Sequence, residues 1–115
     1  MADLYCKVYV NTKMSQEMLL DFIANNFNGY IELRTVYSPF FEADVFKNED
    51  ADPLKAIFPD DGFLYYPYYL EIEPVDNIEQ ASYIAFIARL LSALWKMGAK
   101  AVAACDFEEE LPNHC

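Results

Sequence analysis

The chain has 115 residues, of which 55% are hydrophobic and 17% aromatic, so it can fill one core and is too apolar to be disordered. Nineteen acidic residues against eight basic ones give a formal net charge of −11, which repels phosphate backbones and anionic membranes and attracts basic partners. The same acidity also keeps an aromatic-rich protein soluble. We therefore expect a single domain over residues 1–115 that binds neither nucleic acid nor membrane.

The N-terminal segment carries neither the basic nor the apolar region of a signal peptide. The longest apolar helical run is interrupted by Arg89 and Ser92, which makes it too amphipathic to span a bilayer. Of the three cysteines, Cys6 and Cys105 lie in strand-like apolar patterns, where reduced thiols behave as small hydrophobes. These features predict a cytoplasmic protein without a disulfide framework.

Apolar and polar residues alternate over residues 4–11, which is typical of a half-buried strand. Ser15 then has the position of a helix cap, because Met14 before it and Leu19 after it form a hydrophobic staple. The pattern predicts a helix of about 12 residues that ends at Asn28-Gly29.

Alternation returns over residues 30–47, where Ser38-Pro39 marks a bulge, an edge or a tight turn. The part after Pro39 is either a continuation of the strand or an additional one. Residues 48–62 are acidic and rich in turn-forming residues, with room for one helical turn at 53–58. A loop of this length in a compact domain is often functional.

The next strand is expected at Phe63–Glu73, where Pro74 stops it. Asp76 and Glu79 have capping-box spacing and predict the start of a helix of about twenty residues, which Gly98 closes. A strand over Ala99–Phe107 ends the domain. Trp95, Leu91, Ile84, Phe22 and Val8 are predicted to share one core, because they lie on helix stripes and on an inner strand face.

This order of elements predicts an α+β fold of the ferredoxin-like, split β-α-β type, with an antiparallel sheet and both helices on one face. The first and third main strands would be central, with the last strand beside the first. Tyr5, Tyr9, Tyr65 and Tyr69 would then project from the uncovered face. That face is exposed, covered by the acidic loop, or covered by a second subunit.

Signals for catalysis or a metal are weak. His114 stands beside Cys115 in the tail without converging partners, and three glycines provide no phosphate-binding loop. Asp60-Asp61 and Glu108–Glu110 lack the alternating ligands of a calcium loop. We expect no enzyme activity, no catalytic residues, no metal and no cofactor.

The segment Ala101–Pro112, after a capped helix in a small acidic chain, resembles the immunity proteins that accompany bacterial polymorphic toxins. The likeness is one of class and covers the last third of the chain. It implies a stoichiometric inhibitor that neutralises a cognate toxin domain, often a basic nuclease, and has no activity of its own.

Two functions follow from the residues. The first is an acidic module, monomeric or homodimeric, that binds a basic protein. The second is a ferredoxin-like small-molecule-binding domain or enzyme whose tyrosine-lined site lies at an oligomer interface. For the first, the predicted contacts combine acids of the loop and tail with two tyrosine anchors: Glu49, Asp50, Asp52, Asp60, Asp61, Tyr65, Tyr69, Glu108 and Glu109.

Overall fold

A computed structural model describes residues 3–112, so that His114 and Cys115 lie outside the described residues. These residues form two helices, α1 (Gln16–Phe27) and α2 (Gln80–Lys96), and three short 3-10 turns, η1 (Lys55–Ile57), η2 (Gly62–Tyr65) and η3 (Glu108–Glu110). They also form six strands: β1 (Cys6–Asn11), β2 (Tyr30–Glu32), β3 (Thr35–Tyr37), β4 (Phe41–Lys47), β5 (Tyr68–Pro74) and β6 (Lys100–Cys105).

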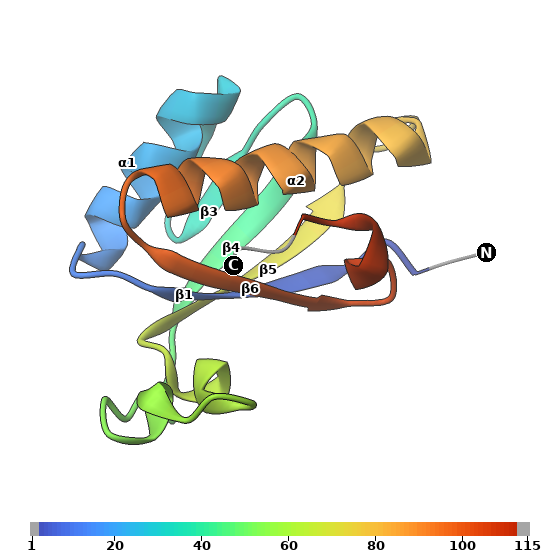
Figure 1. Cartoon of the computed structure of the whole chain (residues 1–115). Helices are drawn as coiled ribbons and strands as arrows, with labels where there is room; N and C mark the ends of the chain where they lie inside the picture. The colour runs from blue at the N-terminus through green and yellow to red at the C-terminus, as the bar shows by residue number, and fades with distance from the viewer. Residues whose placement is uncertain (1–2, 113–115) are drawn as a thin grey trace.

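The strands make one antiparallel sheet in the order β2-β3-β4-β5-β1-β6. Both helices lie on one side of the sheet, and the segment with η1 and η2 projects from the other side (Figure 1). The fold is therefore α+β, with a two-layer core between the helices and one sheet face. Its sheet has two short strands, β2 and β3, at one edge that the sequence pattern did not separate.

Helix α1 begins and ends as predicted. The side chain of Ser15 accepts a hydrogen bond from the Met18 amide at 3.2 Å, which satisfies one of the unpaired amides of the first turn. Asn28 adopts the left-handed conformation, with φ of 56°, and its amide donates to the Ala24 carbonyl. Asparagine tolerates this conformation better than most residues, which is why it ends the helix here.

The predicted capping box at the start of α2 is wrong. The helix begins at Gln80, and the N-cap is Glu79, whose side chain makes no capping bond. Asn77 has φ of 68°, a left-handed turn that separates Asp76 from the helix. Gly98 has φ of 95° after the helix, as the sequence predicted.

Residues 30–47 form three strands rather than one interrupted strand. β2 and β3 make a hairpin with Glu32 opposite Thr35, and Leu33 in its turn has φ of 55°. Such turns normally carry glycine or asparagine, so the dipeptide Leu33-Arg34 gave no signal for a hairpin. At the predicted break, the Ser38 hydroxyl accepts from the amides of Phe40 and Phe41 and so closes the turn into β4, a separate strand.

The strand predicted at Phe63–Glu73 starts five residues later, at Tyr68. Residues 62–65 form η2 instead, and Pro67 has no amide to give to a ladder. The last strand, predicted to reach Phe107, ends at Cys105. Tyr65 therefore does not project from a strand.

The core lies between the helices and the sheet. Val8, Ile84 and Leu91 belong to its buried cluster, and Phe22 and Trp95 are partly buried against that cluster. The five residues predicted to share a core thus do so. Among residues 3–112, no helix combines the length and hydropathy needed to cross a membrane.

β6 is an edge strand that, within the described part of the chain, pairs only with β1. Side chains bond to two of its backbone groups. The Trp95 indole donates to the Ala101 carbonyl at 3.1 Å, and the Glu108 carboxylate accepts from the Cys105 amide at 3.4 Å. The facing thiols of Cys6 and Cys105 are free, with 3.3 Å between their sulfur atoms.

Leu91→Ala is expected to lower the free energy of unfolding by about 2–5 kcal/mol, because Leu91 is 2% exposed and the change leaves a cavity. Urea unfolding followed by circular dichroism measures it. Met18→Ala on α1 is the control, since Met18 is 56% exposed, and it should change stability by less than about 0.5 kcal/mol. A loss at position 91 as small as the control would contradict the assigned helix face.

Tyr83 makes the native state sensitive to alkali. It is fully buried, its hydroxyl donates to the Ile72 carbonyl at 3.3 Å, and burial raises its pKa above the ordinary value of 10.0. The unfolded chain ionises this phenol near pH 10 and the native state does not. The stabilisation from Tyr83 is thus complete below pH 10 and is lost as the pH rises further.

Tyr83→Phe is therefore expected to flatten the decline of stability above pH 10, by up to about 1.4 kcal/mol per pH unit. Urea midpoints of both proteins between pH 8 and pH 11 measure the slope. The variant retains a residual decline, because burial also raises the pKa of Tyr5, Tyr66 and Cys6. An identical slope in both proteins would show that the phenol ionises normally in the native state.

Candidate functional site

The sheet face opposite the helices carries the candidate site. Strand alternation points Cys6, Val8 and Val10 to the core, so the residues between them in β1 lie on the opposite face. There, Tyr9 is opposite Tyr69 in β5, and Lys7 is opposite Glu71. β4 continues these rows, with Phe46 opposite Tyr69 and Asp44 opposite Glu71. Aromatic residues thus cluster near one end of the strands.

A segment that we name the η1–η2 loop, residues 48–67, folds over this aromatic end. Tyr9 is only 9% exposed, although it lies on the face away from the helices. The Phe63 ring in η2 packs edge-on against it, with 5.3 Å between the ring centroids. The predicted tyrosine face is therefore covered by the loop at one end and uncovered toward Glu73.

Asn48 holds the two ends of the loop together. Its side-chain amide donates to the carbonyls of Leu64 at 2.9 Å and Tyr66 at 2.7 Å, and its backbone amide donates to Pro67 at 2.9 Å. These bonds satisfy carbonyls that a strand at 63–67 would have given to a neighbouring strand.

The middle of the loop is also specified by local contacts. The Asp52 carboxylate accepts from the Leu54 amide at 3.0 Å and from the Lys55 amide at 3.4 Å, as in a turn closed by an aspartate side chain. A Cβ on Gly62 would lie 2.5 Å from the Ala56 carbonyl oxygen, so only glycine lets η1 and η2 approach this closely. Asp52 therefore has a structural role in this loop.

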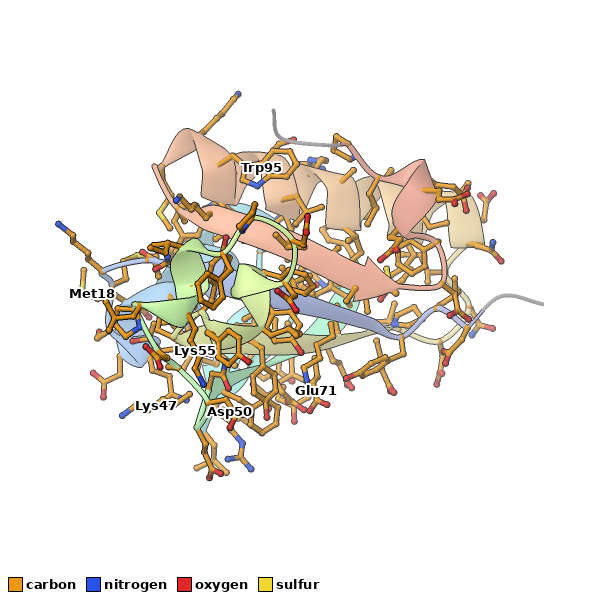
Figure 2. The ribbon with its side chains drawn as sticks, turned by 60° about the horizontal axis from the view of Figure 1, so that its bottom comes forward. Met18, Lys47, Asp50, Lys55, Glu71 and Trp95 are labelled. Atoms are coloured by element: carbon orange, nitrogen blue, oxygen red, sulfur yellow. The ribbon has the colours of Figure 1, made fainter. Side chains whose placement is uncertain are left out.

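Between the loop and the sheet is an open cavity with a volume of about 960 Å³, which we name the cationic bowl. Its rim and floor contain four of the chain's eight cationic side chains, which come from β1, the β2–β3 turn, the end of β4 and η1: Lys7, Arg34, Lys47 and Lys55. In Figure 2, Lys47 and Lys55 lie near each other at the loop, with Asp50 beside them. Glu49 and Asp50 also line it, so its cations outnumber its acids by two.

The cations of the bowl rest on aromatic rings. Lys7 Nζ lies 4.3 Å from the centroid of Tyr69 and 5.0 Å from that of Tyr9. Arg34 Cζ lies 4.7 Å above Phe46, and Lys55 Nζ lies 5.2 Å above Tyr65. Each such pair contributes about 0.5–1 kcal/mol at an exposed site. Lys7 and Arg34 thus contact aromatic rings, although Lys7 is also the strand neighbour of Glu71.

The other end of the same face is acidic. Two residues of β4 and two of β5 supply four carboxylates, which with their neighbours we name the acidic patch: Glu42, Asp44, Glu71 and Glu73, with Tyr5, Thr35 and Tyr37. The Tyr5 hydroxyl donates to Glu71 at 2.7 Å, and the Thr35 hydroxyl donates to Asp44. Desolvation and the bond to Glu71 raise the pKa of Tyr5. In Figure 2, Glu71 lies to the right of Lys55 and Asp50, away from the loop.

The predicted site residues do not all line one concavity. Glu49, Asp50, Tyr65 and Tyr69 line the cationic bowl. Glu108 and Glu109 instead line a groove at the β6 edge, together with Phe63 and Trp95. Asp60 and Asp61 are exposed in the loop and line neither surface.

The predicted contact residues include neither the carboxylates of the acidic patch nor the cations of the bowl. The alternation of Glu42 with Asp44 in one strand and of Glu71 with Glu73 in another did signal one acidic face. The convergence of Lys47 and Lys55 with Lys7 gave no local signal, because it depends on how the loop folds back.

Comparison of the chain with protein-family models, with curated proteins and with solved structures found no match. Within residues 3–112, no group of three or more histidine, cysteine or acidic side chains is arranged to hold a metal ion.

Proposed function

We propose that this protein is a binding module for a basic protein, and that the uncovered end of the sheet face is its contact surface. The observation that carries the proposal is the acidic patch, where adjacent strands present Glu42, Asp44, Glu71 and Glu73 side by side. Folding alone gives no reason to set four carboxylates together, since like charges opposite each other on a sheet destabilise it.

The chemistry of the patch suits a protein partner. Tyrosine is enriched at protein interfaces, and Tyr5 and Tyr37 flank the carboxylates. Lysine and arginine side chains of a partner would offset the repulsion between these acids. Exposed acids farther away, among them Asp60, Asp61 and Glu109, would contribute long-range attraction rather than direct contact.

Leu33 supplies a second reason to expect a partner. It lies at the tip of the β2–β3 hairpin, 97% exposed and with φ of 55°. The left-handed conformation costs a branched residue about 1 kcal/mol or more, and glycine would avoid that cost. A large apolar side chain kept in a strained, exposed turn is well placed to enter an apolar pocket of a partner.

Within this class of function we propose an immunity protein that neutralises a cognate basic toxin. The support is the resemblance of Ala101–Pro112 to such proteins, together with the net charge of −11. A stoichiometric inhibitor needs a rigid, charged surface and no chemistry of its own. We further propose a ferredoxin-like relationship for β1, β4, β5 and β6 with the two helices, the β2–β3 hairpin being an addition at the sheet edge.

The test requires the basic protein encoded beside this one, its association measured by stopped-flow fluorescence at low salt. Glu42→Gln with Glu73→Gln should slow association roughly tenfold, because they remove charge at the contact. Glu17→Gln with Asp21→Asn is the control, since both side chains are exposed on α1, on the other side of the sheet, and the charge change is the same. Equal slowing in both double variants, or no binding by the native protein, would contradict the proposed surface.

Leu33→Gly separates binding from folding. It should leave the free energy of unfolding within about 0.5 kcal/mol, because relief of backbone strain offsets the flexibility of glycine. It should weaken the complex roughly tenfold or more, the value of burying one leucine. Ile57→Ala, which removes another exposed aliphatic side chain, 77% exposed in η1, should bind normally. If the Leu33→Gly variant bound with unchanged affinity, the β2–β3 hairpin would not be part of the interface.

A further inference from the structure

We infer that the cationic bowl is a binding site for a compact, multiply charged anion of the oligophosphate class, either free or as part of a phosphorylated small molecule. The inference does not depend on the proposed protein partner. It rests on the cations of the bowl, on what holds them, and on the size of the cavity.

The first step is the convergence of charge. In a chain with net charge −11, half of all lysine and arginine side chains line one cavity, and they come from four separate segments. Lys7 and Lys47 lie on the sheet, whereas Lys55 reaches the cavity only because Asn48 closes the loop. Gathering cations in this way is unfavourable without a counter-charge.

The second step concerns their free donors. Ring faces occupy one side of Lys7, Arg34 and Lys55. Among residues 3–112, no carboxylate lies within 4.0 Å of the charged nitrogens of these side chains or of Lys47. An ammonium group carries three N–H donors and a guanidinium group carries five. The aromatic rings attract the charge but do not accept conventional hydrogen bonds from these donors. These donors are available to an anion in the cavity.

The third step defines the ligand. Because Glu49 and Asp50 offset two of the four cations, an anion with at least two negative charges is needed to neutralise the bowl. Lysine and arginine together are typical of phosphate recognition, in which arginine binds two oxygens at once and lysine acts as a point charge. A volume of about 960 Å³ lies at the upper end of small-molecule sites and exceeds what a single ion fills. The acidic surface outside the bowl repels a long phosphate polymer along its length, whereas it repels a small anion within the bowl less, because most of those acids are farther from it.

Isothermal titration calorimetry at low salt, without divalent metal ions, tests this with three probes: inorganic triphosphate, ATP and citrate. Saturable binding of triphosphate at one site per chain is expected. Tighter binding of ATP would assign a phosphorylated nucleoside-like ligand, and equal or weaker binding would assign the oligophosphate group itself. Binding of citrate alone, or of no probe, would overturn the inference.

Paired variants then locate the site. Lys47→Gln with Lys55→Gln should weaken triphosphate binding roughly tenfold or more, the cost of losing charge-assisted hydrogen bonds, and both residues are exposed, so the fold should be kept. Lys96→Gln with Lys100→Gln makes the same change in net charge outside the bowl and should weaken binding clearly less than the first pair, because the Coulomb interaction with the anion falls with distance. Equal weakening in the two pairs would show nonspecific attraction and overturn the site.

Discussion

One-sided burial of the sheet determines the rest of this structure. Because successive strand residues point to opposite faces, covering one face with α1 and α2 leaves the other to polar and aromatic side chains. Cys6, Val8 and Val10 secure β1 to the core, and this fixes where Lys7 and Tyr9 point. A shift of register by one residue would bury Lys7 without a partner. The packing of the core therefore also determines which side chains lie on the open face.

The η1–η2 loop turns that face into two different environments. By packing Phe63 on Tyr9, it shields Tyr9 from water and brings Lys55 over the same cavity as Lys7. Toward Glu73 the loop is absent, and the carboxylates remain exposed to solvent or to a partner. The charge of the face is therefore separated along the strand direction, with cations on rings at one end and acids at the other.

The sequence was informative where a structure depends on nearby side chains or on a regular alternation of apolar and polar residues. Alternation along residues 4–11 and the Ser15 and Asn28 caps predicted β1 and α1, since each depends on neighbours within a few residues. It was misleading at Asp76, where capping-box spacing was present but the left-handed Asn77 delayed the helix. It was silent about Leu33, whose turn is held by the strand pairing around it. Of the predicted contact residues, Glu49, Asp50, Tyr65 and Tyr69 line the bowl, whereas the acids that gather on the open face lie in β4 and β5, outside the loop and tail on which the prediction concentrated.

The edge strand β6 has a consequence for behaviour at high concentration. A row of alanines at a sheet margin is flat and offers little steric hindrance to a strand from another molecule, which is how edge-to-edge polymerisation starts. Here the Trp95 indole and the Glu108 carboxylate already bond to the Ala101 carbonyl and the Cys105 amide. A neighbouring chain would have to displace both groups and approach the carboxylates of η3. The acidic residues of η3, which follow β6, thus disfavour aggregation through this edge strand, whose side chains are small.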